Sequence, residues 1–448
     1  MKYVRLLDTT AIKECDDGAL VINTETGENF YVNKTGLLFL RALDGTVQKA
    51  DSVISMLLSQ FDKISEDDFS HDFFEFFSEI KGKGIVAMSE NIADVEKYLL
   101  SSMLVELTMK CNERCIHCYI PNSQKDEAAT MPYETFCKLI DEFVELGGRD
   151  ITLSGGEPLM HKSIKQILYY CHEKGLTINL LSNLMLLTDS YIDIFKHIKI
   201  GYVQTSVYSL IPAIHDNITK IKGSLEKTLN SIEHLLDEKI QVQLSCPVFK
   251  MNKESVLSVI NYAKRKDIHL RTNAALLPQL NGDDSFVVDN ALTSEEWRYV
   301  LCNLTESEPV YMRDFVLEYN NNSSELFQNP KKFLDSCICD AGISCCAVSP
   351  TGDVYPCPEW LSYHLGNINE QSLTNIWNKS SAIRLLRRIN QQKNYKMCLE
   401  CNSIDFCKRC FAYYEQDNKG ELLRISNKNC EDAYTTKLIF DKYYHNND

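Results

Sequence analysis

Residues 104–119 have the sequence LVELTMKCNERCIHCY, and the rest of the chain is organised around this stretch. Residues 103–108 are apolar and favour β-structure, so we expect a strand that ends just before a loop. That loop carries Cys111, Cys115 and Cys118, with three residues between the first pair and two between the second. Three thiolates on one short loop can hold three irons of a cubane [4Fe–4S] cluster and leave the fourth iron open for another ligand.

This loop resembles the C-x3-C-x2-C motif of the radical S-adenosylmethionine (SAM) enzymes. The resemblance implies that Cys111, Cys115 and Cys118 are catalytic metal ligands and that SAM chelates the open iron. One electron then splits a sulfur–carbon bond of SAM, and the resulting 5′-deoxyadenosyl radical abstracts hydrogen from the substrate. A donor such as flavodoxin or ferredoxin supplies that electron. The alternatives are a zinc loop or unrelated thiols, which a cysteine triplet alone does not separate from a cluster site.

The composition argues against several classes of protein. The chain has 448 residues, 44% of them hydrophobic, which is enough for two or three domains with cores of their own. A net charge of −15 disfavours binding to nucleic-acid phosphates. We expect no membrane span and no secretion signal, because no apolar run is long enough for either. The 18 cysteines, many in C-x2-C groups, indicate metal ligands in a reducing cytoplasm.

From residue 103 onward, β-favouring and helical segments alternate, so the sequence predicts an α/β fold. A helix between each pair of strands indicates a parallel sheet with right-handed connections. Ligands of such sheets gather at the carboxyl ends of the strands. The radical SAM resemblance implies a partial (β/α)6 TIM barrel over residues 103–290, followed by a bridging region at 291–336. We expect strands at 104–108, 150–153, 177–181, 202–207, 240–246 and 269–275, and helices at 133–146, 162–174, 189–196, 225–238 and 253–266.

The second expected strand ends in a glycine pair followed by a carboxylate. Gly155 and Gly156 allow the backbone to approach a ligand closely, and Glu157 offers a partner for an ammonium group. The segment resembles the GGE motif of radical SAM enzymes, whose backbone and glutamate receive the amino group of SAM. A plain strand–helix turn is the alternative.

Several residues of this chain occupy positions at which the family contacts SAM, so the resemblance implies further SAM contacts. Ser206 corresponds to a residue that contacts the ribose, and Asn183 lies on the same rim. His117 and Tyr119 stand where the family places an aromatic ring against adenine, although His117 departs from the commoner Phe or Tyr. Lys220 resembles the basic segment near the SAM carboxylate. Ser and Asn at strand ends are more often turn or cap residues.

The first ninety residues contain no metal-binding pattern. Alternation at 19–22 and 29–32 predicts a hairpin, and helical periodicity follows at 35–42, 49–61 and 67–83. A short hairpin followed by three helices resembles the winged-helix-like α+β fold of the PqqD-like peptide-recognition domain. The resemblance implies that residues 1–90 bind a leader peptide as an added strand, and a linker helix is expected at 91–102. A generic winged-helix or dimerisation domain is the alternative.

The C-terminal segment, 337–448, is a second cysteine centre. It contains a tight turn at 349–353 and then the pattern C-x2-C-x5-C-x2-C. These features resemble the SPASM domain, which holds two auxiliary [4Fe–4S] clusters, so that three clusters are implied in all. Cys337 and Cys346 are extra thiols that leave the assignment open, and zinc would also suit the tetrads. The order of ligands in the family implies Cys339, Cys345, Cys357 and Cys410 for the nearer cluster, and Cys398, Cys401, Cys407 and Cys430 for the outer one.

Together these resemblances imply a maturase that modifies a ribosomally made precursor peptide. The expected product is an intrapeptide thioether between a cysteine sulfur and a carbon. Carbon–carbon or carbon–oxygen crosslinks and epimerisation are alternatives, with Cys302 or Cys246 as possible hydrogen donors for the last. An enzyme similar to the anaerobic sulfatase maturases would share the C-terminal cysteine pattern, and a non-catalytic iron–sulfur electron carrier or zinc scaffold would share the cysteines alone. We expect neither a nucleic-acid partner nor a membrane partner.

Overall fold

The computed structural model describes residues 1–445 except positions 8–9, 25, 44, 46, 62–63, 91, 93–97, 126–128, 275, 311–332, 335 and 419. Residue contacts divide the chain into two compact units, Met1–Leu99 and Leu100–Asp448. Half of the linker helix expected at 91–102 lies outside the described residues; the prediction is wrong at 98–101, which are not helical, and at Ser102, which begins a strand. In the described part of the chain, no helix is both long and apolar enough to cross a membrane.

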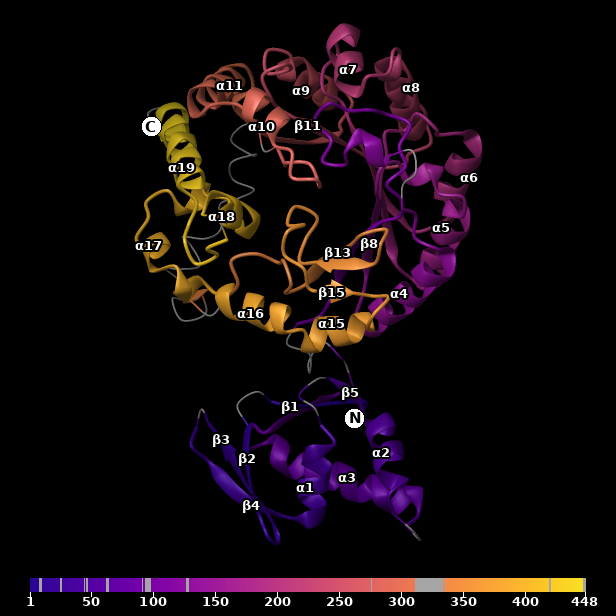
Figure 1. Ribbon diagram of the computed structural model, residues 1–448, viewed down its shortest axis with the longest axis vertical. Coiled ribbons are helices and arrows are strands. Elements are labelled where there is room, and N and C mark those ends of the chain that lie inside the picture. Colours follow the sequence, from indigo (N-terminus) through magenta and orange to yellow (C-terminus); the bar gives the residue numbers. More distant parts are fainter. Residues whose placement is uncertain are drawn as a thin grey trace. The chain divides into compact units, whose positions relative to one another are not determined.

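The N-terminal unit combines two small antiparallel sheets with three helices (Figure 1). The expected hairpin is present, with Ala19 opposite Val32. The three expected helices are present as well. The remaining strands were not predicted; all but one of them are only two to four residues long, too short to show a clear period. The elements are β1 (Tyr3–Leu6), β2 (Thr10–Cys15), β3 (Gly18–Asn23), β4 (Asn29–Asn33), α1 (Lys34–Arg41), β5 (Gln48–Lys49), α2 (Ala50–Leu58), α3 (Glu66–Lys81) and β6 (Val86–Ser89).

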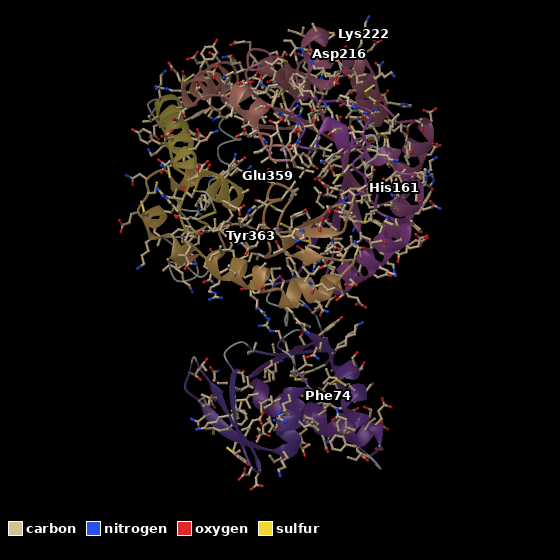
Figure 2. All side chains as sticks on the ribbon, in the orientation of Figure 1. Phe74, His161, Asp216, Lys222, Glu359 and Tyr363 are labelled. Carbon is tan, nitrogen blue, oxygen red and sulfur yellow. The ribbon has the colours of Figure 1, made fainter. Side chains whose placement is uncertain are left out.

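Helix α3 supplies most of the aromatic core of this unit. Its first turn is capped by Ser65, whose Oγ accepts a hydrogen bond from the Asp68 N–H at 3.1 Å. Phe73 and Phe77 are fully buried and pack on Phe39 of α1, with ring centroids 5.5 and 6.3 Å away. Phe74, on the same helix, is only half-buried (Figure 2). The helix therefore holds the unit together and still presents an aromatic side chain on its surface.

The second unit begins with the predicted parallel barrel. All six expected strands and all five expected helices are present with small shifts at their ends, and the strands pair in sequence order. One helix, α7, was not predicted. The strands are β7 (Ser102–Glu106), β8 (Asp150–Ser154), β9 (Thr177–Leu181), β10 (Ile200–Ser206), β11 (Val242–Pro247) and β12 (His269–Asn273). The helices are α4 (Tyr133–Glu145), α5 (Ile164–Glu173), α6 (Asp189–His197), α7 (Pro212–Thr219), α8 (Ser224–Asp237) and α9 (Val256–Arg265).

The two faces of the barrel sheet differ in chemistry. The helices lie along the outer side of the strands (Figure 1), and apolar side chains fill the layer between them. In β10, for example, Val203 and Thr205 are at most 2% exposed, whereas Gln204 and Ser206 are half-buried on the other face. Because side chains alternate along a strand, the inner face is largely polar and is not packed as a core.

The C-terminal segment continues the same sheet. β13 pairs in parallel with β7, Ala347 lying beside Leu104, and β14 and β15 follow β13 to extend the sheet to nine strands. The six-stranded barrel predicted from the sequence is thus one part of a larger sheet. The remaining elements are α10 (Ser285–Asn290), α11 (Ser294–Ser307), β13 (Cys345–Val348), β14 (Asp353–Tyr355), β15 (Gly366–Asn367), α15 (Leu373–Lys379), α16 (Ser381–Ile389), α17 (Lys396–Leu399), α18 (Phe411–Asp417) and α19 (Asn427–Phe440).

Candidate active site and cluster sites

The three-cysteine loop leaves the carboxyl end of β7, as predicted. The Glu113 N–H donates to the Cys111 sulfur at 3.4 Å, and the Asn183 side-chain amide lies 3.9 Å from the same sulfur. Burial raises the pKa of the Cys111 thiol to about 11, so its ionisation needs a nearby positive charge. Hydrogen bonds from N–H groups stabilise a thiolate. These donors and three thiols on one loop fit an iron–sulfur cluster held by Cys111, Cys115 and Cys118.

The end of α7 holds this loop in place. The Arg114 and Ile116 N–H groups donate to the carbonyls of Thr219 and Ile218, at 3.0 and 2.9 Å. The turn after α7 is fixed by Asp216, which accepts hydrogen bonds from the N–H groups of Gly223 and Leu225 at 2.6 and 3.0 Å. Asp216 was not singled out from the sequence, although Pro212 at the start of α7 is a helix signal.

Lys220 lies on that same turn, next to Asp216 and Lys222, which are labelled in Figure 2. Its backbone is left-handed, with a φ of 60°, and its side chain is exposed. The ammonium donates a hydrogen bond to the Asn217 side chain at 2.7 Å. In this structure Lys220 therefore closes the turn, and its role toward SAM stays a prediction.

The glycine pair brings the second strand against the cysteine loop. The Gly156 N–H donates to the Thr108 carbonyl at 2.6 Å. A methyl group on Gly155 would overlap the Thr108 carbonyl, and one on Gly156 would overlap that of Lys110. Gly155 also has a φ of +135°, which side chains disfavour. The two glycines thus allow the backbone after β8 to pack directly against the backbone of the cysteine loop. The sequence pattern did not reveal this contact.

Glu157 is completely buried behind the loop. Its carboxylate accepts hydrogen bonds from the Leu159 N–H at 3.0 Å, the Ser182 hydroxyl at 2.8 Å and the Asn183 N–H at 2.8 Å. Burial is the main effect on its pKa, which rises to about 7, and the three donors oppose that rise. The Asn183 side chain then donates to Asn112 at 2.7 Å. Glu157 therefore positions Asn183, and Asn183 in turn holds the cysteine loop through Asn112.

His117 and Tyr119 flank the third cysteine. The His117 ring lies 4.9 Å from the Tyr208 ring and 5.6 Å from that of Phe249. Burial lowers the pKa of His117 to about 4, and its Nδ1 is buried without a hydrogen-bond partner. Tyr119 donates its hydroxyl proton to Glu106 at the end of β7. The structure thus places both rings beside the third cysteine, against protein side chains, and their roles toward adenine stay predictions.

The thiols assigned to the nearer auxiliary cluster lie close together. Burial raises the pKa of Cys339 to about 12, and the neighbouring charge of Cys410 adds to the rise. Burial is the main cause of the raised pKa of Cys357, with Cys339 and Cys410 adding to it, and burial, then Cys346 and Cys339, raise the pKa of Cys345. The Ala341 N–H donates to the Cys339 sulfur at 3.3 Å. The structure thus brings together the four thiols that the family resemblance grouped.

The second set of four is also adjacent. Burial raises the pKa of Cys407 to about 12, with further effects from Cys430, Cys398 and Cys401. The Ser403 N–H donates to the Cys401 sulfur at 3.4 Å. Again a donor two residues after the cysteine points at its sulfur, as at Cys111. This repeated arrangement fits thiolates that bind a cluster.

The extra thiols differ in their surroundings. Cys346 is 1% exposed and packs in the apolar layer behind β13, on the face opposite Cys345. Cys337 remains near Cys339 and affects its pKa. Among the described residues, no three His, Cys, Asp or Glu side chains converge tightly enough to hold a single metal ion.

Comparisons with known proteins agree with this arrangement. Residues 105–263 match the radical SAM superfamily, and residues 339–402 match the iron-sulfur cluster-binding domain named SPASM. The AdoMet-dependent heme synthase of Methanosarcina barkeri is 27% identical over 68% of this chain and 90% of its own length. The antilisterial bacteriocin subtilosin biosynthesis protein AlbA of Bacillus subtilis is 22% identical over 87% of this chain and 86% of its own.

A solved structure shows the same fold over nearly the whole chain. The crystal structure of Streptococcus suis SuiB bound to precursor peptide SuiA aligns with a TM-score of 0.56 and 13% identity, covering 95% of this chain and 99% of that chain. The likeness includes the region of both matched domains. The chain therefore carries a radical SAM domain followed by an iron-sulfur cluster-binding domain, and it is a radical SAM enzyme.

Proposed function

We propose that this enzyme is a peptide maturase that forms an intrapeptide crosslink in a ribosomally made precursor, most simply a thioether between a cysteine sulfur and a carbon. Relatives named for bacteriocin and killing-factor maturation cover 87% and 88% of this chain, and the heme synthases cover 68%. The heme synthases leave about a third of the chain unmatched. Heme synthesis is thus the second candidate function, but it does not account for an additional recognition unit.

The observation that carries the proposal is the outer edge of β4 in the N-terminal unit. Within the described residues, β4 pairs only with β3, so its other edge offers main-chain groups to a further strand. Gly36, at the start of α1, packs closely against both β4 and α3. A methyl group added to Gly36 would lie 2.8 Å from Phe76 of α3 and 3.1 Å from Val32 of β4. We propose that a leader peptide adds to β4 and packs on α3, as in the PqqD-like domains.

The hydrogen-bond alternation identifies which main-chain groups are available. The Asn23 N–H donates to the Glu28 carbonyl at 2.8 Å, which makes that pair hydrogen-bonded. In the same register Phe30 and Val32 also bond to β3, whereas the N–H of Tyr31 points to the outer edge. The Tyr31 side chain is 54% exposed. Tyr31 is therefore the centre of the proposed leader-binding edge.

The proposed cofactors are SAM and three [4Fe–4S] clusters, with an electron donor such as flavodoxin or ferredoxin. When bound, the SAM-binding cluster supplies the electron that cleaves SAM to a 5′-deoxyadenosyl radical. Cys111, Cys115 and Cys118 hold that cluster, and Asn183 and Glu157 keep their loop in position. Ser206, half-buried on the inner face of β10, is the proposed contact to the ribose of SAM. Burial and hydrogen bonding of these side chains support the assignments.

The choice of a thioether rests on the surroundings of the available thiols. Epimerisation needs a protein thiol that returns a hydrogen atom on the inner side of the barrel. Cys246 is fully buried in the outer apolar layer, and Cys302 on α11 packs against that same layer. Neither of these two thiols faces the polar side of the sheet. The nearer auxiliary site, beside Cys337, offers instead a place for a substrate thiolate.

Anaerobic co-expression with each small open reading frame next to the gene tests the function. A thioether product is lighter than the precursor by two hydrogens per crosslink and takes up no deuterium in heavy water. Epimerisation leaves the mass unchanged in light water and fixes one deuterium in heavy water. A crosslinked precursor without loss of cysteine thiol reactivity points to a carbon–carbon or carbon–oxygen bond. If no peptide is altered while a tetrapyrrole substrate is converted, the peptide assignment is wrong.

A further inference from the structure

The inner face of the barrel carries one feature that neither the clusters nor SAM account for. Arg271, in β12, is the only Lys or Arg in the six barrel strands. Its side chain is exposed, and it makes no hydrogen bond or ion pair within the part of the chain that the structure describes. An unpaired guanidinium in a protein of net charge −15 needs an explanation.

The neighbours of Arg271 in the sequence fix its direction. Leu270 and Thr272 are buried at 5% and 8% exposure, and Leu270 belongs to the apolar layer under the helices. Arg271 therefore points to the opposite, inner face. The strand register places it beside Ser245 of β11, which in turn lies beside Ser206 of β10. Arg271 thus stands in the same row as a residue expected to contact SAM, roughly 10 Å away by strand spacing.

A second, independent observation lies on the neighbouring strand. Gln243 is 9% exposed, and its side-chain Oε1 is buried without a hydrogen-bond partner. It occupies the inner face of β11, because Val242 and Leu244 on either side lie in the apolar layer. Its backbone is roughly 8 Å from that of Arg271 by strand spacing and rise. A buried carbonyl oxygen without a partner is destabilising, and a ligand that donates a hydrogen bond to it would offset that cost.

We infer that Arg271 and Gln243 form a subsite for a carboxylate-bearing residue of the substrate peptide. The guanidinium pairs with the carboxylate, from either an Asp or Glu side chain or the C-terminus of the peptide. The Oε1 of Gln243, which is the atom left without a partner, accepts a hydrogen bond from the N–H of the peptide group beside that carboxylate. The inference rests on the proposed function and adds to it a specificity rule: the modified segment carries a negative charge near the reacting residue.

A simpler role for Arg271 is protection of a sheet edge. β12 is the last strand in the sheet order, and inward-pointing charges at such positions discourage strand pairing between molecules. That role explains the charge of Arg271, but it gives no partner to Gln243. It also predicts no dependence of turnover on the charge of the substrate, so the two roles are separable by experiment.

The test uses the full-length, cluster-loaded enzyme with the precursor found by co-expression. Each Asp and Glu near the modified residue is changed to Asn or Gln, and a further peptide carries a C-terminal amide. With wild-type enzyme, removal of one of these carboxylates is expected to lower kcat/KM about 10- to 100-fold. The side-chain and C-terminal versions distinguish the two sources of the charge.

Arg271→Gln is expected to process the acidic and neutralised peptides at equal rates, and Arg271→Lys to keep part of the preference. Arg265→Gln, an exposed arginine at the end of α9, is the matched control and should keep the wild-type ratio. The subsite is wrong if every neutralised peptide is processed normally, or if Arg271→Gln changes only the KM for SAM. If the wild-type enzyme alters no peptide at all, the proposed function itself fails, and the subsite with it.

Discussion

The main-chain N–H of Glu157 donates a hydrogen bond to the carbonyl oxygen of Lys110 at 2.7 Å. This bond joins the glycine-rich turn after β8 to the cysteine loop after β7, directly before Cys111. The two sequence motifs are therefore not independent contacts for SAM but a single backbone arrangement. Displacement of either one moves the cysteines.

Gly156→Ala should disrupt the cysteine loop without removing any ligand. The new methyl would overlap the Lys110 carbonyl and come within 2.6 Å of that of Met109, so the backbone must move. We expect a loss of about 1–3 kcal/mol in stability and impaired loading of the SAM-binding cluster. The measurement is iron content together with SAM cleavage under anaerobic conditions. Gly82→Ala is the control, because nothing lies near its added methyl, and equal behaviour of both variants would contradict the steric argument.

Replacement of Cys111, Cys115 and Cys118 by alanine should remove one cluster of three. If all sites are loaded, the wild-type chain holds about twelve irons and the triple variant about eight. SAM cleavage should vanish, because the other clusters have no part in binding SAM. Iron analysis and detection of 5′-deoxyadenosine give both results. Stoichiometric zinc in protein purified without oxygen would falsify the cluster assignment.

Substitutions at Tyr31 test the proposed leader-binding edge. Tyr31→Pro removes the outward N–H of β4 but spares the bonds to β3, whereas Tyr31→Ser removes the same side chain and keeps that N–H. We expect the proline variant to bind precursor about 2- to 10-fold more weakly than the serine variant, as for one lost hydrogen bond. Fluorescence anisotropy of a labelled precursor measures this. Equal affinities would mean that the leader does not pair with β4.

His215 should make the stability of the protein depend on pH. It is 1% exposed, its Nδ1 accepts a hydrogen bond from the Tyr208 N–H at 3.3 Å, and burial lowers its pKa from 6.5 to about 4. The folded state therefore disfavours the charged ring. The stabilising effect of the neutral ring is complete above pH 6.5 and is lost as the pH falls toward 4.

Relative to His215→Gln, the wild type should lose about 1.4 kcal/mol of unfolding free energy between pH 7.5 and 5.5. Denaturant unfolding at the two pH values, followed for both proteins, gives that difference. A difference of the opposite sign would show that His215 is charged in the folded protein. The glutamine keeps a hydrogen-bond acceptor and removes only the titration.

The sequence predicted those parts of the molecule that local pattern controls. β9 lies at 177–181 as expected, and α6 and α8 begin within a residue of their expected starts, because alternation and amphipathic period set such elements. Helix α7 escaped prediction, since it is short and begins at Pro212 in a segment without a clear apolar stripe. The contact between Gly156 and Lys110 escaped too, because a close approach of two backbones leaves no pattern in either stretch.

The pairing of strands that lie far apart in the chain could likewise not be predicted from the sequence. Nothing in residues 345–348 indicates that they pair with Ser102–Val105, and the family order alone chose Cys345 over the adjacent Cys346 as a ligand. Only the strand geometry separates them, because it turns one toward Cys339 and the other into the apolar layer. Arg271 and Gln243 were missed for the same reason: their shared face exists only once β11 and β12 lie side by side.

The parallel pairing of β13 with β7 has a consequence for how the protein is made. Strand β7, the first of the barrel, can pair with β13 only after residue 348 has been synthesised, more than two hundred residues later in the chain. Until then the nascent barrel exposes an open strand edge, the kind of surface that associates with other chains. Cys345, a proposed ligand of the nearer auxiliary cluster, is part of β13, so under that assignment iron delivery and closure of this edge concern the same few residues. Chaperone capture during translation should therefore concentrate on chains that stop before β13.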